Sequence, residues 1–211
     1  MADIEILYSD NAVIVVNKPA DLLSVPGRGP DKRDSLIFRL QKNFPTARIV
    51  HRLDCATSGL MVVAQTAEAH RELSRQFHDR EVSKRYIAII AGRLEKTQGS
   101  VDLPLMTDWP NRPRQMVSEE GKAALTYYQV LEELSVSGVS ASRVALTPVT
   151  GRSHQLRVHM LALGHVILGD QLYADGEAAS ASSRLLLHAE QLAFDHPETG
   201  ERVDYVQSAD F

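Results

Sequence analysis

Short apolar runs separated by turn residues dominate the chain, and the clearest of them begins at Ala12. Residues 12–16 (Ala-Val-Ile-Val-Val) are apolar and mostly β-branched, which predicts a buried strand. Pro19 ends it, because proline has no N–H to donate within a central sheet. Comparable runs predict further strands at residues 60–64, 86–91, 126–131, 143–149 and 184–194.

Three segments show the apolar spacing of helices instead. Ser35 is a favourable first residue for a short helix that carries Leu36, Ile37 and Leu40. Residues 67–80 place apolar side chains four positions apart on one face. A third helix is predicted to open at Gly151-Arg152-Ser153 and run to about residue 163, where Gly164 provides a natural end.

Turn-rich segments fill the spaces between these elements. Loops are predicted at residues 26–34, 107–115, 135–142 and 174–183, the second of them because of Pro110 and Pro113. Strands outnumber helices, and the two types do not alternate regularly. We therefore predict an α+β fold, with a mixed, largely antiparallel sheet and flanking helices.

The 211 residues show no internal repeat and no linker, which favours a single domain over residues 1–211. Cys55 is the only cysteine, so neither an intrachain disulfide nor a cysteine-rich zinc site is possible. No apolar run reaches the roughly 20 residues that span a bilayer. The acidic start, residues 1–5, does not have the pattern of a signal peptide. We expect a cytoplasmic protein that is not bound to a membrane.

The charge distribution changes the picture of possible partners. The formal net charge is −4, which by itself argues mildly against a nucleic-acid partner. Residues 1–122, however, carry 18 Lys and Arg against 16 Asp and Glu, whereas residues 123–211 carry 5 against 11. Phosphate binding needs a locally basic surface and not a basic protein. Ordinary solvated charges explain any single cluster equally well.

Several catalytic classes are excluded by the motifs that are missing. His154 and His159 are five residues apart and not four, so the helical metal pair of a zincin is not present. No Walker motif and no Gly-x-Ser-x-Gly elbow occurs. A zinc deaminase needs a Cys-x-x-Cys pair, which a single cysteine forbids.

Asp54 remains as an acid in an unusual setting. It lies between Arg52 and the turn-forming Thr57-Ser58-Gly59, directly before a strong strand. A carboxylate fixed by such a turn suits catalysis, but an acid that merely caps the turn explains the pattern as well. Further along, Arg152 lies beside a predicted helix start, where it could hold a carboxylate ionised or pair with a structural acid. Spacing alone leaves both alternatives open.

Four ordered motifs resemble the RluA group of pseudouridine synthases. His51 to Gly59 (HRLDCATSG) is similar to the HRLDxxTSG signature of that family. Residues 17–27 resemble its NKPxGLLSVPG motif, and Lys84-Arg85-Tyr86 resembles its Lys-x-Tyr motif. Residues 151–159 (GRSHQLRVH) resemble its GRxHQxRxH motif. The resemblance extends from about residue 6 to the C-terminus.

The resemblance implies an enzyme that isomerises uridine to pseudouridine without any cofactor or metal. It implies the pseudouridine synthase fold with a central RNA-binding cleft, and no N-terminal S4 domain in this chain. The implied partners are one site in 23S ribosomal RNA and one in the anticodon stem-loop of several tRNAs. We expect a monomer. A synthase with another RNA target and a non-catalytic RNA-binding module are the alternatives.

The resemblance also assigns roles to residues at matching positions. Asp54 is the expected catalytic carboxylate, acting as nucleophile or base, and Arg152 its ionic partner. Tyr86 is expected to stack on the uracil and to serve in removal of the C5 proton, although a core strand tyrosine fits its context too. Arg52 is expected to fill the space of a flipped base or to contact phosphate. The further expected contacts to the RNA backbone are Lys18, Arg28, Lys32, Arg33, Arg75, Arg112 and Arg114.

Overall fold

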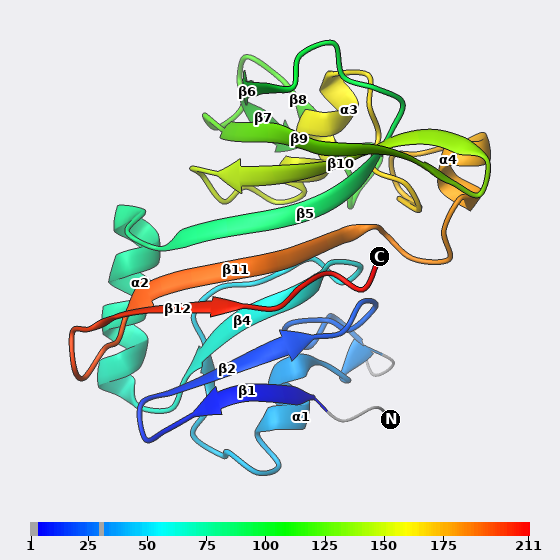
Figure 1. Ribbon diagram of the computed structural model, residues 1–211. Coiled ribbons are helices and arrows are strands. Elements are labelled where there is room, and N and C mark those ends of the chain that lie inside the picture. The colour runs from blue at the N-terminus through cyan, green and yellow to red at the C-terminus, as the bar shows by residue number, and fades with distance from the viewer. Residues whose placement is uncertain (1–3, 30–31) are drawn as a thin grey trace. The chain divides into compact units, whose positions relative to one another are not determined.

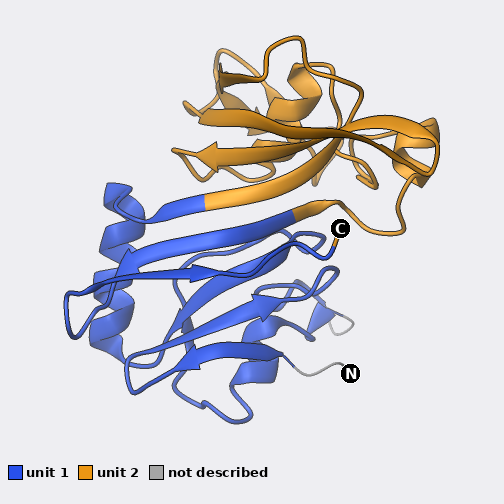
Figure 2. Ribbon diagram, viewed as in Figure 1, with its two compact units in different colours: residues 1–84, 188–210 blue, residues 85–187, 211 orange. Residues whose placement is uncertain are grey.

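The computed structural model describes residues 4–29 and 32–211 (Figure 1). The chain forms two compact units, of residues 1–84 with 188–210 and of residues 85–187 with 211 (Figure 2). The predicted loop at residues 26–34 is therefore described only in part, and residues 1–3 of the acidic start at 1–5 lie outside the described residues. The assignment of one catalytic domain to residues 1–211 stays a prediction.

The first unit is built on a sheet with the strand order β1-β2-β4-β11. Neighbouring strands are antiparallel except for β4 and β11, which run parallel. Two shorter strands extend it, because β3 pairs with β4 and β12 pairs with β11. The strands are β1 (Glu5–Ser9), β2 (Val13–Lys18), β3 (Arg48–Ile49), β4 (Ser58–Ala64), β11 (Leu187–Asp195) and β12 (Arg202–Val206).

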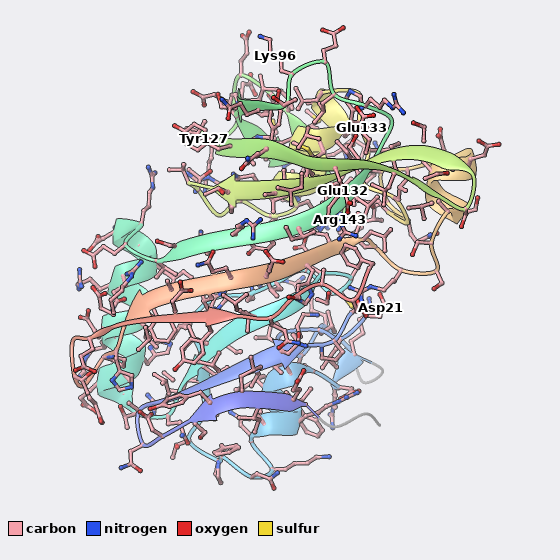
Figure 3. The ribbon with its side chains drawn as sticks, viewed as in Figure 1. Asp21, Lys96, Tyr127, Glu132, Glu133 and Arg143 are labelled. Carbon is pink, nitrogen blue, oxygen red and sulfur yellow. The ribbon has the colours of Figure 1, made fainter. Side chains whose placement is uncertain are left out.

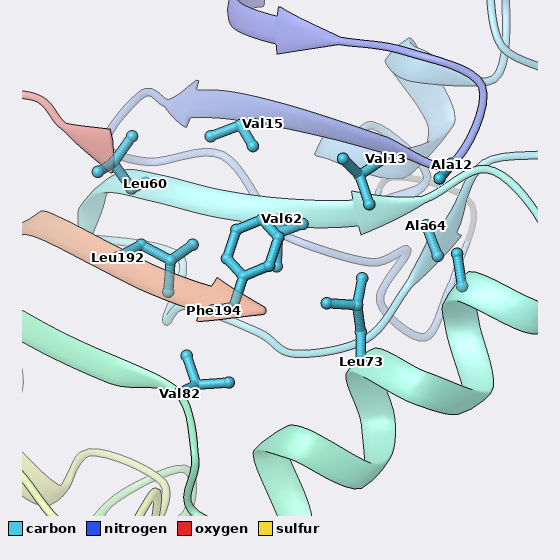
Figure 4. Packing of buried hydrophobic residues seen from close by; sticks show 11 residues of the cluster. Ala12, Val13, Val15, Leu60, Val62, Ala64, Leu73, Val82, Leu192 and Phe194 are labelled. Carbon is cyan, nitrogen blue, oxygen red and sulfur yellow. The ribbon is translucent and has the colours of Figure 1, made fainter. Parts of the chain in front are cut away.

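The core of this unit lies between one face of the sheet and α2 (Ala67–Asp79) (Figure 4). Every second residue of a strand points to the same face, so Val13 and Val15 lie beside Leu60 and Val62. Leu73 of α2 packs against this layer and is fully buried. Every residue of β4 is buried, which explains why its apolar run is continuous and does not alternate.

Both helices of the first unit begin where the sequence predicts. The hydroxyl of Ser35 accepts a hydrogen bond from the Phe38 backbone N–H and caps α1 (Leu36–Leu40). Thr66 caps α2 in the same way, by accepting from the Ala69 backbone N–H at 3.1 Å. These bonds satisfy amide groups that have no partner inside the helix.

The second unit contains an antiparallel sheet with the strand order β5-β10-β9-β6. The predicted loop at residues 135–142 is wrong, because β9 and β10 continue to a two-residue turn at Ser137 and Gly138. Both turn residues have positive φ angles, 49° and 84°, as a tight hairpin turn requires. The strands are β5 (Ser83–Ala91), β6 (Gln98–Asp102), β9 (Leu125–Val136) and β10 (Val139–Pro148).

A separate hairpin and two helices complete this unit. β7 (Leu105–Thr107) and β8 (Gln115–Val117) form a two-stranded sheet, so the irregular segment predicted at 107–115 shortens to 108–114. The third predicted helix starts later than expected, since α3 (Gln155–Ala162) begins only after a turn at Ser153 and His154. The segment 174–183 contains the short helix α4 (Gly176–Ser180) and is not purely a loop.

The α+β fold class is confirmed by these elements. β4 and β11 pair in parallel, whereas the other strand pairs described above are antiparallel, so the pairing is mixed and largely antiparallel, as predicted. None of the described helices is long and apolar enough to cross a lipid bilayer.

Candidate active site

Asp54 lies in the segment that joins β3 to β4 in the first unit. Its carbonyl oxygen accepts a hydrogen bond from the Thr57 backbone N–H at 3.1 Å, which closes a tight turn. Its side chain is half-buried, whereas Thr57 is buried. The turn therefore leaves the Asp54 side chain partly exposed to solvent.

Lys18 fastens this turn from the end of β2. Its side chain has no exposed surface, and its Nζ donates to the carbonyl oxygens of Leu22 at 2.7 Å and Cys55 at 3.0 Å. It also donates to the Pro19 carbonyl at 2.8 Å. Burying an ammonium group is costly unless oxygens surround it, as they do here. Cys55, the residue after Asp54, is therefore held by a side chain of the motif at residues 17–27.

Ser24 provides a second attachment on the other side of Asp54. Its hydroxyl donates to the Leu53 carbonyl oxygen at 2.8 Å and accepts from the Leu53 backbone N–H at 3.2 Å. Both residues are buried. Asp54 thus follows a residue fixed by Ser24 and precedes one fixed by Lys18, and both anchors come from residues 17–27.

His51 is the first residue of the motif at residues 51–59, and its imidazole ring is held in the neutral form. Its Nε2 accepts the backbone N–H of Val62 at 3.1 Å, and its ring stacks on Phe77 of α2 with centroids 4.4 Å apart. Removal from water, together with the positive charge of Lys84, lowers the pKa of His51 to about 3. A protonated ring could not accept from Val62, so this contact depends on the neutral form.

The end of the second motif is attached to β11. The hydroxyl of Ser58 lies 2.8 Å from Nδ1 of His188, and Nε2 of His188 lies 2.8 Å from the Gln207 carbonyl oxygen. A carbonyl only accepts, so Nε2 carries the proton and Nδ1 accepts from Ser58. Gly59 has a φ of +115°, and a Cβ there would lie 2.3 Å from the Ala189 carbonyl oxygen. Only glycine fits this position.

Tyr86 and Arg152 belong to the second unit. Tyr86 lies in β5, half-buried, opposite Leu146 of β10. Arg152 follows β10 by four residues and is half-buried, and its Nε donates to the Ala123 carbonyl oxygen at 3.0 Å. Tyr86 pairs with Leu146, close to the C-terminal end of β10 at Pro148, and Arg152 follows that same end. Both residues therefore belong to one end of the β5–β10 strand pair.

Gln155 fixes the backbone of Arg152. Its Oε1 accepts from the Arg152 backbone N–H at 3.0 Å and from the Thr150 hydroxyl at 2.7 Å. Its Nε2 donates to the Leu125 carbonyl and to the Thr126 hydroxyl oxygen, both at 3.0 Å. Because the oxygen and the nitrogen of this buried side-chain amide are both hydrogen-bonded, Gln155 holds the backbone at Arg152 in a single conformation.

Two more residues of the motif at residues 151–159, Arg157 and His159, are buried. Arg157 makes a two-pronged ion pair with Asp170, with Nε–Oδ2 and Nη2–Oδ1 distances of 2.7 and 2.6 Å. His159 is fully buried, and burial lowers its pKa. Its Nε2 donates to the Leu103 carbonyl at 3.0 Å, so its Nδ1 accepts from the Thr126 hydroxyl at 2.9 Å. Both support the fold around Arg152.

The expected contact of Lys18 with the RNA backbone is corrected by its burial. An ammonium with no exposed surface has none to offer to a phosphate. Its signal in the sequence was the NKP motif, which identified Lys18 but not its structural role. Ser24 was missed altogether, although it lies in the same motif.

Arg75 is surrounded by acids and suits phosphate poorly. Its guanidinium contacts Glu72 at 2.7 Å, Glu81 at 2.9 Å and Asp79 at 3.1 Å. Glu72 first, and then Glu81, raise the pKa of Arg75. An RNA phosphate would have to compete with all three carboxylates. Arg28 and Arg52 are exposed, and Arg112 and Arg114 lie in the 108–114 segment.

The acidic second part of the sequence is partly neutralised where its strands meet. Glu132 of β9 pairs with Arg143 of β10 at 2.5 Å (Figure 3). Glu133 of β9 pairs with Arg93, which follows β5, at 3.0 Å. Within residues 4–29 and 32–211, no group of three His, Cys, Asp or Glu side chains is arranged to hold a metal ion. The absence of a metal and of a cofactor stays a prediction.

The structure thus brings the predicted residues into two groups. Asp54 is positioned inside the first unit, and Tyr86 and Arg152 are positioned inside the second. The ion pair of Asp54 with Arg152 and the central cleft stay predictions.

Known proteins resemble the chain over nearly all of its length. The family model described as RNA pseudouridylate synthase matches residues 12–162. The dual-specificity RNA pseudouridine synthase RluA of Yersinia pestis is 56% identical over 98% of this chain and 99% of that protein. The proteins of the same name from Escherichia coli (strain K12) and Haemophilus influenzae are 54% and 51% identical, over 98% and 99% of this chain and 93% and 94% of theirs.

Solved structures agree with this assignment. The structure of Human RNA Pseudouridylate Synthase Domain Containing 1 aligns with a TM-score of 0.85 and 31% identity, over 99% of this chain and 84% of that chain. All four motifs lie within residues 12–162, the segment that the family model matches. The chain therefore belongs to the RluA group of RNA pseudouridine synthases, the enzymes that isomerise uridine to pseudouridine in RNA.

Proposed function

We propose that this enzyme modifies two kinds of RNA, 23S ribosomal RNA and the anticodon stem-loop of several tRNAs. The observation that carries the proposal is the identity of 51–56%, over nearly the full chain, to relatives whose name describes a dual-specificity RNA pseudouridine synthase. With these substrates, the enzyme acts in the cytoplasm. A synthase of another target would share the reaction and differ in the surfaces that select the RNA.

We propose that Asp54 carries the reaction. Isomerisation breaks the C1′–N1 bond, turns the uracil and forms a C1′–C5 bond, while C5 loses a proton and N1 gains one. A carboxylate can attack C1′ as a nucleophile and leave again, or take the C2′ proton on a glycal route. The anchored turn at Leu53 and Cys55 supports this role, because a catalytic group must be held in position before the substrate arrives.

Arg152 and Tyr86 complete the proposed site. A guanidinium beside Asp54 keeps the carboxylate charged while RNA excludes water, since a nearby opposite charge favours the ionised form. The fixed backbone of Arg152 supports this assignment. Tyr86 offers a ring for the uracil and a hydroxyl for the C5 proton. The target uridine must leave its stack to reach these groups, and Arg52 fills the space behind it.

Release of tritium from C5-labelled RNA tests this function. The enzyme is incubated with a 23S RNA fragment and, separately, with a tRNA transcript, each labelled at C5 of uridine. We expect release from both, limited to one position in each when the pseudouridines are mapped. Release from only one RNA contradicts the dual specificity, and release from neither contradicts the substrate assignment as a whole.

A further inference from the structure

Trp109 projects from the turn between β7 and β8 in the second unit. It is the only tryptophan of the chain, and 65% of its surface is exposed, more than for any other large apolar side chain described. An exposed indole leaves a large apolar surface in water, and such surfaces mark places of interaction when other features point to a ligand.

The turn that carries Trp109 is held rigidly. The Asp108 carboxylate accepts from the Asn111 side-chain amide at 3.0 and 3.1 Å and from its backbone N–H at 3.3 Å. The Asp108 backbone N–H donates to the Arg114 carbonyl at 3.0 Å, and the Arg114 N–H donates to the Asn111 carbonyl at 3.1 Å. The indole is therefore presented by a fixed loop, so little conformational entropy is lost when it binds a ligand.

A cation accompanies the ring. The guanidinium of Arg112 lies over the Trp109 ring, 4.8 Å from its centroid. Trp109 and Arg112 together form a surface that combines an aromatic face with a positive charge, the two properties by which proteins bind an unpaired nucleotide. A purely apolar protein partner would not use the guanidinium.

The same loop is connected to the segment that carries Arg152. Arg114 lies over the ring of Tyr173, 5.2 Å from its centroid. The Tyr173 hydroxyl accepts from the Gln115 backbone N–H at 2.7 Å and lies 2.7 Å from Nδ1 of His154. His154 follows Arg152 by two residues, so a nucleotide held at Trp109 is held at a defined place relative to the Arg152 backbone.

We propose that Trp109 stacks on an unpaired base of the RNA substrate other than the target uridine. The base uses the ring face opposite Arg112, and the Arg112 guanidinium neutralises a phosphate of the same RNA strand. The proposal rests on the RNA substrates of the proposed function and adds a contact that selects single-stranded nucleotides. Every base has a π face, so this contact adds affinity for looped RNA and does not read the sequence.

The single tryptophan gives a direct test, because all indole emission comes from Trp109. The enzyme is titrated with an anticodon stem-loop, and saturation is confirmed by filter binding. Stacking predicts that emission is quenched and that acrylamide no longer reaches the ring in the saturated complex. A fully paired duplex of equal length should leave both signals unchanged. Unchanged emission in the saturated stem-loop complex overturns the proposal.

Kinetics of variants provide the second test. Loss of a stacked base corresponds to about 1–3 kcal/mol, so Trp109→Ala should raise KM roughly 5- to 150-fold and leave kcat within about twofold. Trp109→Phe should lie between it and the wild type. Phe38→Ala is the matched control, because Phe38 is also exposed and lies under Lys42, and its KM should not change.

The outcomes separate this proposal from the proposed function. A wild-type enzyme that releases no tritium from the stem-loop refutes the function and not the stacking. Normal turnover by the wild type with an unchanged KM in Trp109→Ala refutes the stacking. Circular dichroism shows whether Trp109→Ala folds. If it does not, the KM of Trp109→Phe and the quenching of wild-type emission test the stacking instead.

Discussion

The Nζ of Lys18 donates to the carbonyl oxygen of Cys55 at 3.0 Å, across 37 residues of sequence. This bond ties the end of β2 to the residue that follows Asp54. The motifs at residues 17–27 and 51–59 are separate in the sequence but bonded in the fold, because a side chain of the former holds the backbone of the latter. Lys18 thus anchors the turn that carries Asp54, and the carbonyl oxygens around its ammonium satisfy its charge inside the protein.

Replacement of Lys18 should damage both stability and catalysis. Lys18→Met leaves the carbonyls of Pro19, Leu22 and Cys55 without this donor, which should lower the free energy of unfolding by about 2–4 kcal/mol. We expect kcat to fall more than KM rises, because the Asp54 turn loses its position. Urea unfolding and steady-state kinetics measure both effects. Lys42→Met, at an exposed site, is the control, and an equal effect there would contradict the anchor.

His51 predicts a specific dependence of stability on pH. Its pKa is about 3 in the folded protein and near 6.5 when unfolded, so folding favours the neutral ring. This contribution is complete above pH 6.5 and is lost as the pH falls from 6.5 towards 3, at about 1.4 kcal/mol per pH unit. The stability difference between wild type and His51→Gln should shrink over that range. A constant difference would show that His51 does not titrate as described.

The two most buried strands of the first unit could be predicted from the sequence, whereas the short and mostly exposed strands β1 and β6 could not. β4 is buried along its whole length and β2 at every residue except Asn17, and burial imposes an apolar run that is easily seen. β1 and β6 are mostly exposed, so no such pattern marked them. β12 alternates between exposed and half-buried residues, a period-two signal that was present and overlooked.

The site shows a similar division. Motifs pointed to Asp54, Tyr86 and Arg152 as the proposed reacting groups, because such groups recur at fixed positions in a family. The supports of Asp54 were not predicted, because a lysine in a motif suggests a phosphate contact until its burial is known. Trp109 was not singled out either, since exposure of a side chain cannot be read from local sequence.

Tyr86 allows stacking to be separated from proton chemistry. Tyr86→Phe keeps the ring and removes the hydroxyl, so loss of turnover with intact RNA binding is expected if the hydroxyl takes the C5 proton. If the ring only stacks, the Phe variant stays active and Tyr86→Ala is the damaging change. Single-turnover tritium release with both variants distinguishes the two roles, and a fully active Ala variant would remove Tyr86 from the site.

Arg52 tests the cost of extracting the target base. A side chain that fills the vacated space offsets part of an unstacking cost of a few kcal/mol. Arg52→Ala should therefore reduce kcat/KM more on a structured stem-loop than on a short unstructured RNA with the same uridine. A phosphate contact predicts equal losses on both RNAs at one fixed salt concentration. Equal losses would leave Arg52 as a backbone contact only.

The most direct test of the account is pseudouridine formation by Asp54→Asn. The amide matches the carboxylate in size but is neither a nucleophile nor a base at neutral pH. The variant should unfold at the same urea concentration as the wild type and bind the stem-loop with unchanged affinity. Its release of tritium from C5-labelled RNA should fall by at least about 1000-fold, and addition of metal ions should not restore it. Turnover within about tenfold of the wild type would contradict the assignment of Asp54 as the catalytic carboxylate.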